Sequence, residues 1–158
     1  IPYTLNPGGP NHEELASLIG IYEYFNQVYN HHFADNENII RNKISKINNL
    51  ISNHEEKIAN PILEYLSHNK NFRLIGKNQI NNKDRAPTIS FTNINMSSKD
   101  LSSYLVSNKI ATRNDNFYAW RCLKALNVDT NDGVVRISMT HYNTIEEVNN
   151  LIKILEKI

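Results

Sequence analysis

The sequence predicts an α+β fold in which a small, largely antiparallel sheet is packed with helices and preceded by long helices. Three observations predict it. Apolar residues recur every three or four positions over the first part of the chain, the spacing of amphipathic helices. Four short runs rich in β-branched and aromatic residues follow. Helical segments separate these runs, which favours a sheet covered on one face by helices.

The first helix is expected to begin after Asn11, because asparagine is a good N-cap and Glu14 stands at the distance of a capping box. Its end is expected near Asn30. The apolar stripe that predicts this helix consists of Leu15, Leu18, Ile19, Tyr22, Phe25 and Tyr29.

A second, longer helix is expected from about Asp35, with isoleucine and leucine side chains along one side from Ile39 to Leu66. Pro61 lies inside this pattern. Proline lacks a backbone N–H and its ring crowds the preceding turn, so Pro61 is expected to kink or interrupt the helix.

The remainder of the chain alternates β-type runs with helical segments. The predicted strands cover residues 72–75, 88–92, 110–113 and 134–139, and helices are predicted over 98–107 and 117–126. Thr144 is expected to open the last helix, with Glu147 completing a capping box.

Composition limits the classes of function. Lysine and arginine number 17 against 16 acidic residues, a net charge of +1, so bulk charge favours neither nucleic acid nor an anionic membrane as a partner. The single cysteine, Cys122, excludes an internal disulfide framework and fits a reducing compartment. No apolar run approaches the length of a membrane span, and cytoplasmic is the default expectation. The histidines show no metal-ligand spacing, so no metal is expected.

Arg136 is the first candidate for a ligand contact, because it lies inside an otherwise apolar strand. A guanidinium removed from water needs an anion, and its planar fork suits a carboxylate or a phosphate. Two partners satisfy this requirement: a bound ligand, or an Asp or Glu of the same domain.

Four segments together resemble the fold-type I pyridoxal-phosphate enzymes of the class V aminotransferase group, which includes the cysteine desulfurases. The run 134–148 resembles the group's C-terminal signature, and residues 8–13 resemble its Gly-Thr-x-Asn turn. Residues 86–91 resemble the strand that opens the small domain, and 109–113 the strand before the active-site loop. Their order and spacing agree with the group along nearly the whole chain.

This resemblance implies a division of the chain. Residues 1–34 would be the C-terminal tail of a large pyridoxal-phosphate-binding domain whose remainder is absent, 35–70 a connecting long helix, and 71–158 the small domain. The Schiff-base lysine and the aspartate that pairs with the pyridine nitrogen in this group map to no residue here. We therefore expect an inactive C-terminal fragment, in keeping with a first residue, Ile1, that is not Met.

The resemblance also implies roles for individual residues. Arg136 would bind the α-carboxylate of an amino-acid substrate. Arg113 would either contact the substrate or stabilise its loop through an acid such as Asp115. Gly8 and Gly9 lie in the turn that, in the group, contacts the cofactor phosphate of the partner subunit. Gly9 stands where the group has threonine, so the hydroxyl donor is lost, while the backbone donor remains and the adjacent helix N-terminus is expected to favour an anion.

The active-site loop departs from the desulfurase pattern Arg-x-Gly-x-x-Cys-Ala. The matching residues are 113–119, and Tyr118 occupies the position of the nucleophilic cysteine. A phenol cannot carry a persulfide, so no catalytic residue is assigned within this chain. For Tyr118 an aromatic packing role is favoured over proton donation. Cys122, further along, is interpreted as a small buried core residue, with a displaced nucleophile as the alternative.

The resemblance thus implies a pyridoxal-phosphate-dependent lyase or transferase that acts on an amino acid and is a homodimer at full length. The cofactor, pyridoxal 5'-phosphate, is expected on the full-length protein and not on this chain alone. The alternative is a non-enzymatic α+β module that binds a ligand through the Arg136 strand or forms a dimerisation surface.

Overall fold

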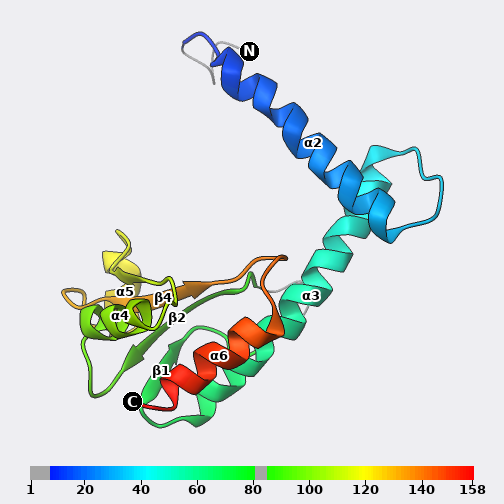
Figure 1. Cartoon of the computed structure of the whole chain (residues 1–158). Helices are drawn as coiled ribbons and strands as arrows, with labels where there is room; N and C mark the ends of the chain where they lie inside the picture. Colours follow the sequence, from blue (N-terminus) through cyan, green and yellow to red (C-terminus); the bar gives the residue numbers. More distant parts are fainter. Residues whose placement is uncertain (1–7, 81–84) are drawn as a thin grey trace. The chain divides into compact units, whose positions relative to one another are not determined.

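A computed structural model describes residues 8–80 and 85–158 of the chain (Figure 1). The chain divides into two compact units, Ile1–Leu50 and Ile51–Ile158, each described by itself below. Within the described ranges, no helix is both long and apolar enough to cross a bilayer.

The first unit contains helix α2 (His12–His32) and the beginning of helix α3 (Ile40–His68). Asn11 caps α2 as predicted: its side-chain oxygen accepts from the backbone N–H groups of Glu13 and Glu14, each at 3.1 Å.

A polar cluster ties the turn between α2 and α3. Tyr29 is 1% exposed and donates its hydroxyl proton to Asp35. The ammonium group of Lys46 forms an ion pair with the same carboxylate. The ring of Phe33 stacks on that of Tyr29 at 5.0 Å between centroids, and Lys43 lies 5.0 Å from the Tyr29 centroid. These contacts fix the turn although few side chains of this unit are buried.

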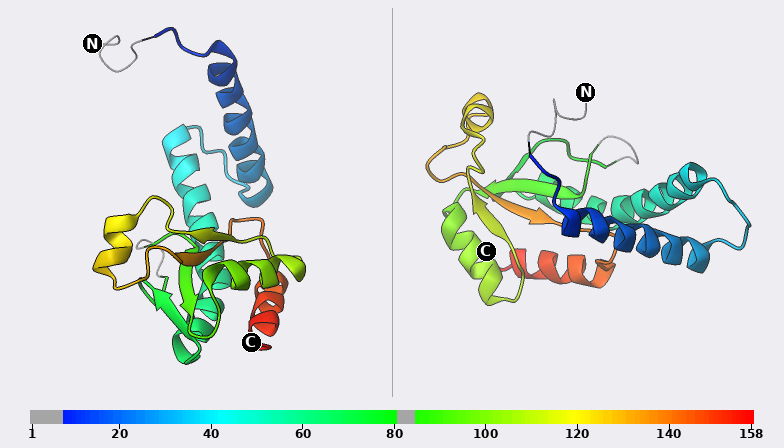
Figure 2. Two further views of the ribbon diagram at one scale, coloured as in Figure 1. Left: turned by 90° about the vertical axis from the view of Figure 1, so that its left-hand side faces the viewer. Right: turned by 90° about the horizontal axis from the view of Figure 1, so that it is seen from above.

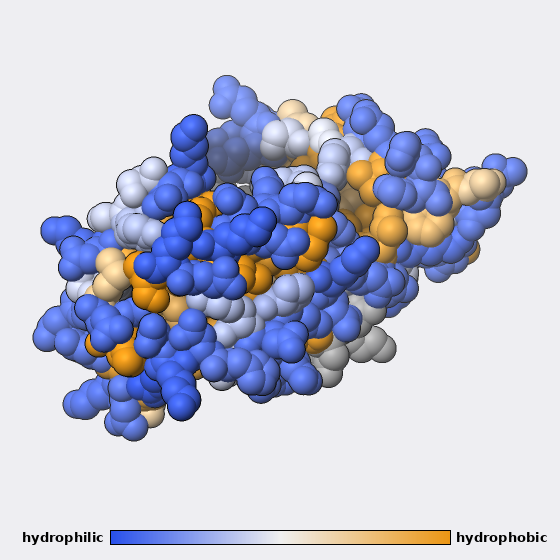
Figure 3. All heavy atoms as spheres, turned by 60° about the horizontal axis from the view of Figure 1, so that its bottom comes forward, coloured by the Kyte–Doolittle hydropathy of each residue, from blue (hydrophilic) through white to orange (hydrophobic). Residues whose placement is uncertain are grey.

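Much of the predicted apolar stripe of α2 lies at the surface. The exposed large hydrophobic residues of the first unit are Leu15, Leu18, Ile19, Ile21, Tyr22, Tyr24, Ile39, Ile40 and Ile44. A hollow of about 250 Å³ between α2 and α3 is lined almost entirely by apolar side chains of this unit. In the space-filling view, hydrophobic residues (orange) interrupt a mainly hydrophilic surface (Figure 3).

Helix α3 continues without interruption through Pro61, so the predicted interruption is wrong. The flanking turns explain this result. Ile58, Ile62, Leu63 and Leu66 on either side of Pro61 are at most 1% exposed, and burial of their side chains stabilises the helix on both sides of the missing donor.

The second unit is built on a four-stranded sheet in the order β1-β2-β4-β3, with every neighbouring pair antiparallel. The strands are β1 (Phe72–Ile75), β2 (Thr88–Asn93), β3 (Arg113–Asp115) and β4 (Val134–Ser138). The helices that follow α3 are α4 (Ser98–Ser107), α5 (Trp120–Ala125) and α6 (Ile145–Leu155). The α+β fold class is confirmed.

One face of this sheet forms the core of the second unit. Alternate strand residues, among them Phe91, Val135 and Ile137, pack against side chains of α3, α4 and α6. The ribbon views show these helices beside the sheet (Figures 1 and 2). Helix α6 begins as predicted, with a complete capping box between Thr144 and Glu147.

Strand β3 begins three residues later than predicted, at Arg113 instead of 110. Helix α4 holds the intervening segment. The N–H of Ile110 donates to the carbonyl of Leu105 at 3.0 Å, and the hydroxyls of Thr112 and Ser102 lie 2.9 Å apart. Because these bonds keep residues 110–112 beside α4, the segment cannot pair with β4.

Candidate functional site

The second face of the sheet carries the two predicted substrate-binding residues, Arg113 and Arg136. Side chains alternate across a strand, and cross-strand partners share a face. The register places the following residues on the face opposite the core: Arg73, Ile75, Thr88, Ser90, Thr92, Arg113, Asp115, Val134, Arg136 and Ser138. This face is therefore rich in arginine and hydroxyl groups.

Arg136 lies on β4 between Ser90 of β2 and Arg113 of β3, its cross-strand partners. Its side chain is half-buried, and its guanidinium carbon lies 4.0 Å from the centroid of the Phe117 ring. No carboxylate among the described residues lies within ion-pair distance of Arg136. The described part of the domain therefore does not supply the acidic partner considered from the sequence.

Phe117 was not identified from the sequence as a site residue. It packs against a small apolar cluster on this face, formed by Leu123, Val128 and Val134. The Phe117 ring thus contacts both the apolar cluster and the guanidinium of Arg136. This arrangement restricts the rotamers of Arg136. The sequence gives little indication of this contact, because Phe117 precedes Arg136 by 19 positions and reaches it only through the path of the loop after β3.

The loop between β3 and α5 carries backbone strain. Phe117 and Tyr118 have φ values of 53° and 59°, in the left-handed region that costs about 1 kcal/mol or more for a residue with a side chain. Asn116 holds this conformation: its side-chain oxygen accepts from the N–H of Tyr118 at 3.0 Å, and its side-chain nitrogen donates to the carbonyl of Thr130 at 3.3 Å.

Gly133 permits the close approach of the β3 end to the start of β4. It has a φ of 75°, and a Cβ atom at this position would lie 2.3 Å from the carbonyl carbon of Asp115 and 2.7 Å from the nitrogen of Asn116. Only glycine fits both requirements. Gly133 therefore fixes the loop that delivers Phe117 to Arg136.

Arg113 is exposed and directly faces Arg136 across the β3–β4 pair. It forms no ion pair with Asp115 in the described structure, so the loop-stabilising alternative for Arg113 has no support there. Instead, Asp115 accepts a hydrogen bond from the N–H of Asn116 at 2.6 Å.

Arg73, the third arginine of this face, has a structural role. Its guanidinium donates to the carbonyl of Asn127 at 2.8 Å and to that of Leu126. These carbonyls end helix α5, where a positive charge is favourable. Arg73 thus anchors α5 to the sheet and is engaged by the protein itself.

Two interpretations of the loop region are wrong. Cys122 is exposed and not a core residue, because α5 presents Leu123 to the apolar cluster instead. Tyr118 is 99% exposed and packs on nothing in the described structure, since the left-handed turn directs it outward. The structure brings Arg113 and Arg136 together and leaves both Tyr118 and Cys122 at the surface.

Gly8 and Gly9 precede α2 in the first unit and are exposed, and a Cβ atom added to either residue would meet nothing within 4 Å. The start of α2 does not by itself suit a phosphate. The Asn11 side chain already accepts from two N-terminal amides, and Glu13 and Glu14 place negative charge in the first turn. The phosphate contact expected at Gly8 and Gly9 would therefore rest on backbone N–H groups that precede these two amides.

The loop that follows β4 is held by α3. The ring Nε2 of His54 lies 2.8 Å from the carbonyl oxygen of Asn143 and acts as the donor, since a carbonyl can only accept. Next to it, burial raises the pKa of Glu55, an effect that the charges of His141 and His54 oppose. This contact fixes the path between Arg136 and α6.

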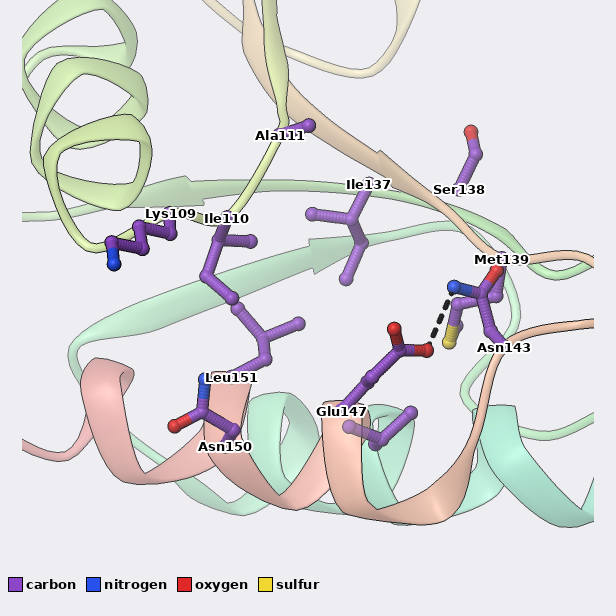
Figure 4. Close-up of a pocket in the computed structure, with 11 residues that line it drawn as sticks. Lys109, Ile110, Ala111, Ile137, Ser138, Met139, Asn143, Glu147, Asn150 and Leu151 are labelled. Atoms are coloured by element: carbon purple, nitrogen blue, oxygen red, sulfur yellow. Dashed lines mark hydrogen bonds between the residues drawn. The ribbon is translucent and has the colours of Figure 1, made fainter.

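A hollow of about 470 Å³ lies on the core side of the sheet edge, between residues 109–111, the end of β4 and α6 (Figure 4). Ile110, Ile137 and Leu151 point into it, and the Glu147 carboxylate accepts from Asn143 at 3.0 Å on its rim. None of the candidate site residues lines this hollow. Lys109, Ile110 and Ala111, which follow α4, line one side of it.

Residues 42–151, most of the chain, match the family model described as aminotransferase class-V. The chain belongs to the class V aminotransferase family. A curated relative, the aminotransferase-like protein FGM3 of Gibberella zeae, is 33% identical over 109 residues, which cover 68% of this chain and 27% of the relative. Members of this family use pyridoxal phosphate.

Solved structures of the same family share the fold. A cysteine desulfurase from Thermococcus onnurineus NA1 superposes with a TM-score of 0.59 at 26% identity, covering 68% of this chain and 25% of that protein. A NifS-like protein from Rickettsia africae ESF-5 superposes with a TM-score of 0.56 at 18% identity, covering 68% and 29%. The chain thus spans about a quarter of the length of these relatives.

Proposed function

We propose that this chain is the C-terminal portion of a pyridoxal-phosphate-dependent lyase or transferase that acts on an amino acid, and that Arg136 binds the carboxylate of that amino acid. The observation that carries the proposal is the state of Arg136: half-buried, braced by Phe117, and without a carboxylate partner among the described residues. A half-buried guanidinium without an anionic partner can still form a charge-assisted pair, and a carboxylate accepts two parallel hydrogen bonds from it.

The chemistry of this family is supplied by pyridoxal phosphate, which withdraws electrons from the amino acid. The contribution proposed for this chain is to bind and orient. A carboxylate fixed by the two-pronged contact of Arg136 sets the direction of the bonds at the neighbouring carbon atom. Phe117 limits the rotation of the arginine. Gly8 and Gly9 are proposed to contribute backbone N–H groups to a cofactor phosphate of a partner subunit.

We propose the following domains for the chain. Residues 1–34 are the end of a large cofactor-binding domain, residues 35–70 connect that domain to the small domain, and residues 71–158 form the substrate-binding small domain. On this proposal the chain alone is inactive. We also propose that the full-length protein is a homodimer, supported by the exposed apolar side chains of α2 and of the start of α3. The mass of the full-length protein in solution, measured by light scattering, tests the dimer.

The enzymatic proposal is tested on the full-length protein that carries this chain. We expect purified protein to absorb visible light from bound pyridoxal phosphate and to turn over at least one amino acid. Replacing Arg136 with Lys is expected to raise the KM for that amino acid roughly tenfold or more, because lysine cannot make the two-pronged contact. Colourless protein that ignores added pyridoxal phosphate would favour a non-enzymatic α+β module.

A further inference from the structure

We propose that the ligand of this face carries two anionic groups, one bound by Arg136 and the second by Arg113, so that the preferred amino acid has an anionic side chain. The inference rests on the proposed role of Arg136 and adds a substrate class to it. It follows from the register of β3 and β4, which sets the two arginines directly opposite each other.

Like charges directly opposite in an antiparallel pair are destabilising, because their Cβ atoms lie only about 5 Å apart on the same face. Acidic neighbours usually compensate such a pair. Neither Arg113 nor Arg136 has a carboxylate within ion-pair distance among the described residues. A ligand with two anionic groups removes the repulsion and satisfies both guanidinium groups at once.

Other groups on this face do not take the place of that ligand. Asp115 lies on the same side of β3 as Arg113, but its carboxylate accepts from the N–H of Asn116. Arg73 is engaged with the carbonyls that end α5. Among the described residues, the Arg113–Arg136 pair therefore has no carboxylate within ion-pair distance.

The two arginines differ in a way that assigns their roles. Arg136 is half-buried and stacked on Phe117, so its guanidinium has a fixed position suited to the carboxylate common to all amino acids. Arg113 is exposed and stacks on no ring among the described residues, so its long side chain can reach anionic groups at different distances. On this assignment, Arg136 provides binding and Arg113 provides selectivity.

The test is a calorimetric titration of the 158-residue chain at constant ionic strength with two ligands. L-Aspartate carries two carboxylates, and L-2-aminobutyrate has the same carbon skeleton with one. We expect aspartate to bind roughly tenfold more tightly or better. The Arg113→Gln variant should lose this preference, with a much larger loss of affinity for aspartate than for 2-aminobutyrate. Arg136→Gln should weaken the binding of both ligands.

The Arg41→Gln variant is the matched control, because Arg41 is an exposed arginine of α3 in the first unit and its loss removes the same charge. It should leave both affinities unchanged, and circular dichroism checks that each variant is folded. Equal affinities for the two ligands in the unaltered chain would overturn the two-anion inference alone. Binding of neither ligand, or binding unaffected by Arg136→Gln, would overturn the carboxylate role of Arg136 as well.

Discussion

The guanidinium group of Arg136 rests on the ring of Phe117, with 4.0 Å between the guanidinium carbon and the ring centroid. The two residues come from different segments, a strand and the strained loop before α5. Their contact makes the loop part of the proposed binding site. It also means that changes in the loop should be measurable as changes in ligand affinity.

Phe117→Leu is therefore expected to weaken the binding of L-2-aminobutyrate to the chain about two- to fivefold, since the lost cation–π contact is worth about 0.5–1 kcal/mol. Leucine keeps an apolar side chain against Leu123 and Val134. Phe117→Tyr retains the ring and should restore the affinity. Calorimetric titration measures both variants, and equal losses for Leu and Tyr would show that the ring is not what positions Arg136.

Gly133→Ala is expected to lower the free energy of unfolding by about 2–4 kcal/mol, because the new Cβ would meet the backbone of Asp115 at 2.3 Å. Urea denaturation measures this loss. Gly20→Ala is the matched control: Gly20 lies inside α2 with nothing within 4 Å of an added Cβ, so alanine should stabilise the helix by about 0.5–1 kcal/mol. Similar changes in the free energy of unfolding for both variants would contradict the close backbone approach at Gly133.

Glu147→Gln is expected to lower the melting temperature near neutral pH but not in acid. Hydrogen bonds from the Asn143 side chain and the Thr144 backbone hold the pKa of Glu147 below its ordinary value. A depressed carboxyl pKa stabilises the folded state above the unfolded pKa, and this stabilisation is lost as pH falls through the folded pKa. The difference in melting temperature between the two proteins should therefore close below about pH 4. A gap that persists in acid would mean that Gln fails for steric reasons.

Cys122 is expected to react with a water-soluble maleimide in the native protein as fast as in the denatured protein, to within about an order of magnitude. The reason is its exposure on α5. Cys122→Ser should change the free energy of unfolding by no more than about 0.5 kcal/mol. Protection of the thiol until unfolding would restore the interpretation of Cys122 as a core residue.

Most helices and strands of the described chain could be predicted from local pattern. The Asn11 cap, the capping box of Thr144 and the bounds of α4 depend on residues three or four positions apart, and the structure confirms them. Strand β3 begins later than predicted because Thr112 bonds to Ser102 of α4, and the spacing of residues along the chain does not indicate this contact. The interruption predicted at Pro61 is absent because packing on both sides compensates for the missing donor.

The candidate site was only partly predictable for the same reason. An arginine in an apolar strand is visible in the sequence, so Arg136 could be singled out. That it stacks on Phe117 and faces Arg113 depends on strand register and on two left-handed residues in a loop. The exposure of Cys122 likewise depends on which side of the short helix α5 meets the sheet. These are tertiary contacts, and they cannot be predicted from the spacing of residues along the chain.

The most direct test of the account is a double-mutant cycle between Arg136 and the ligand carboxylate. The binding of L-2-aminobutyrate and of its amide is measured calorimetrically for the unaltered chain and for Arg136→Gln, which removes the positive charge. If Arg136 binds the carboxylate, the amide should bind roughly tenfold more weakly or worse to the unaltered chain, and this difference should nearly disappear in the variant, because the lost interaction is the same one. An amide penalty of equal size in both proteins would show that Arg136 does not contact the carboxylate.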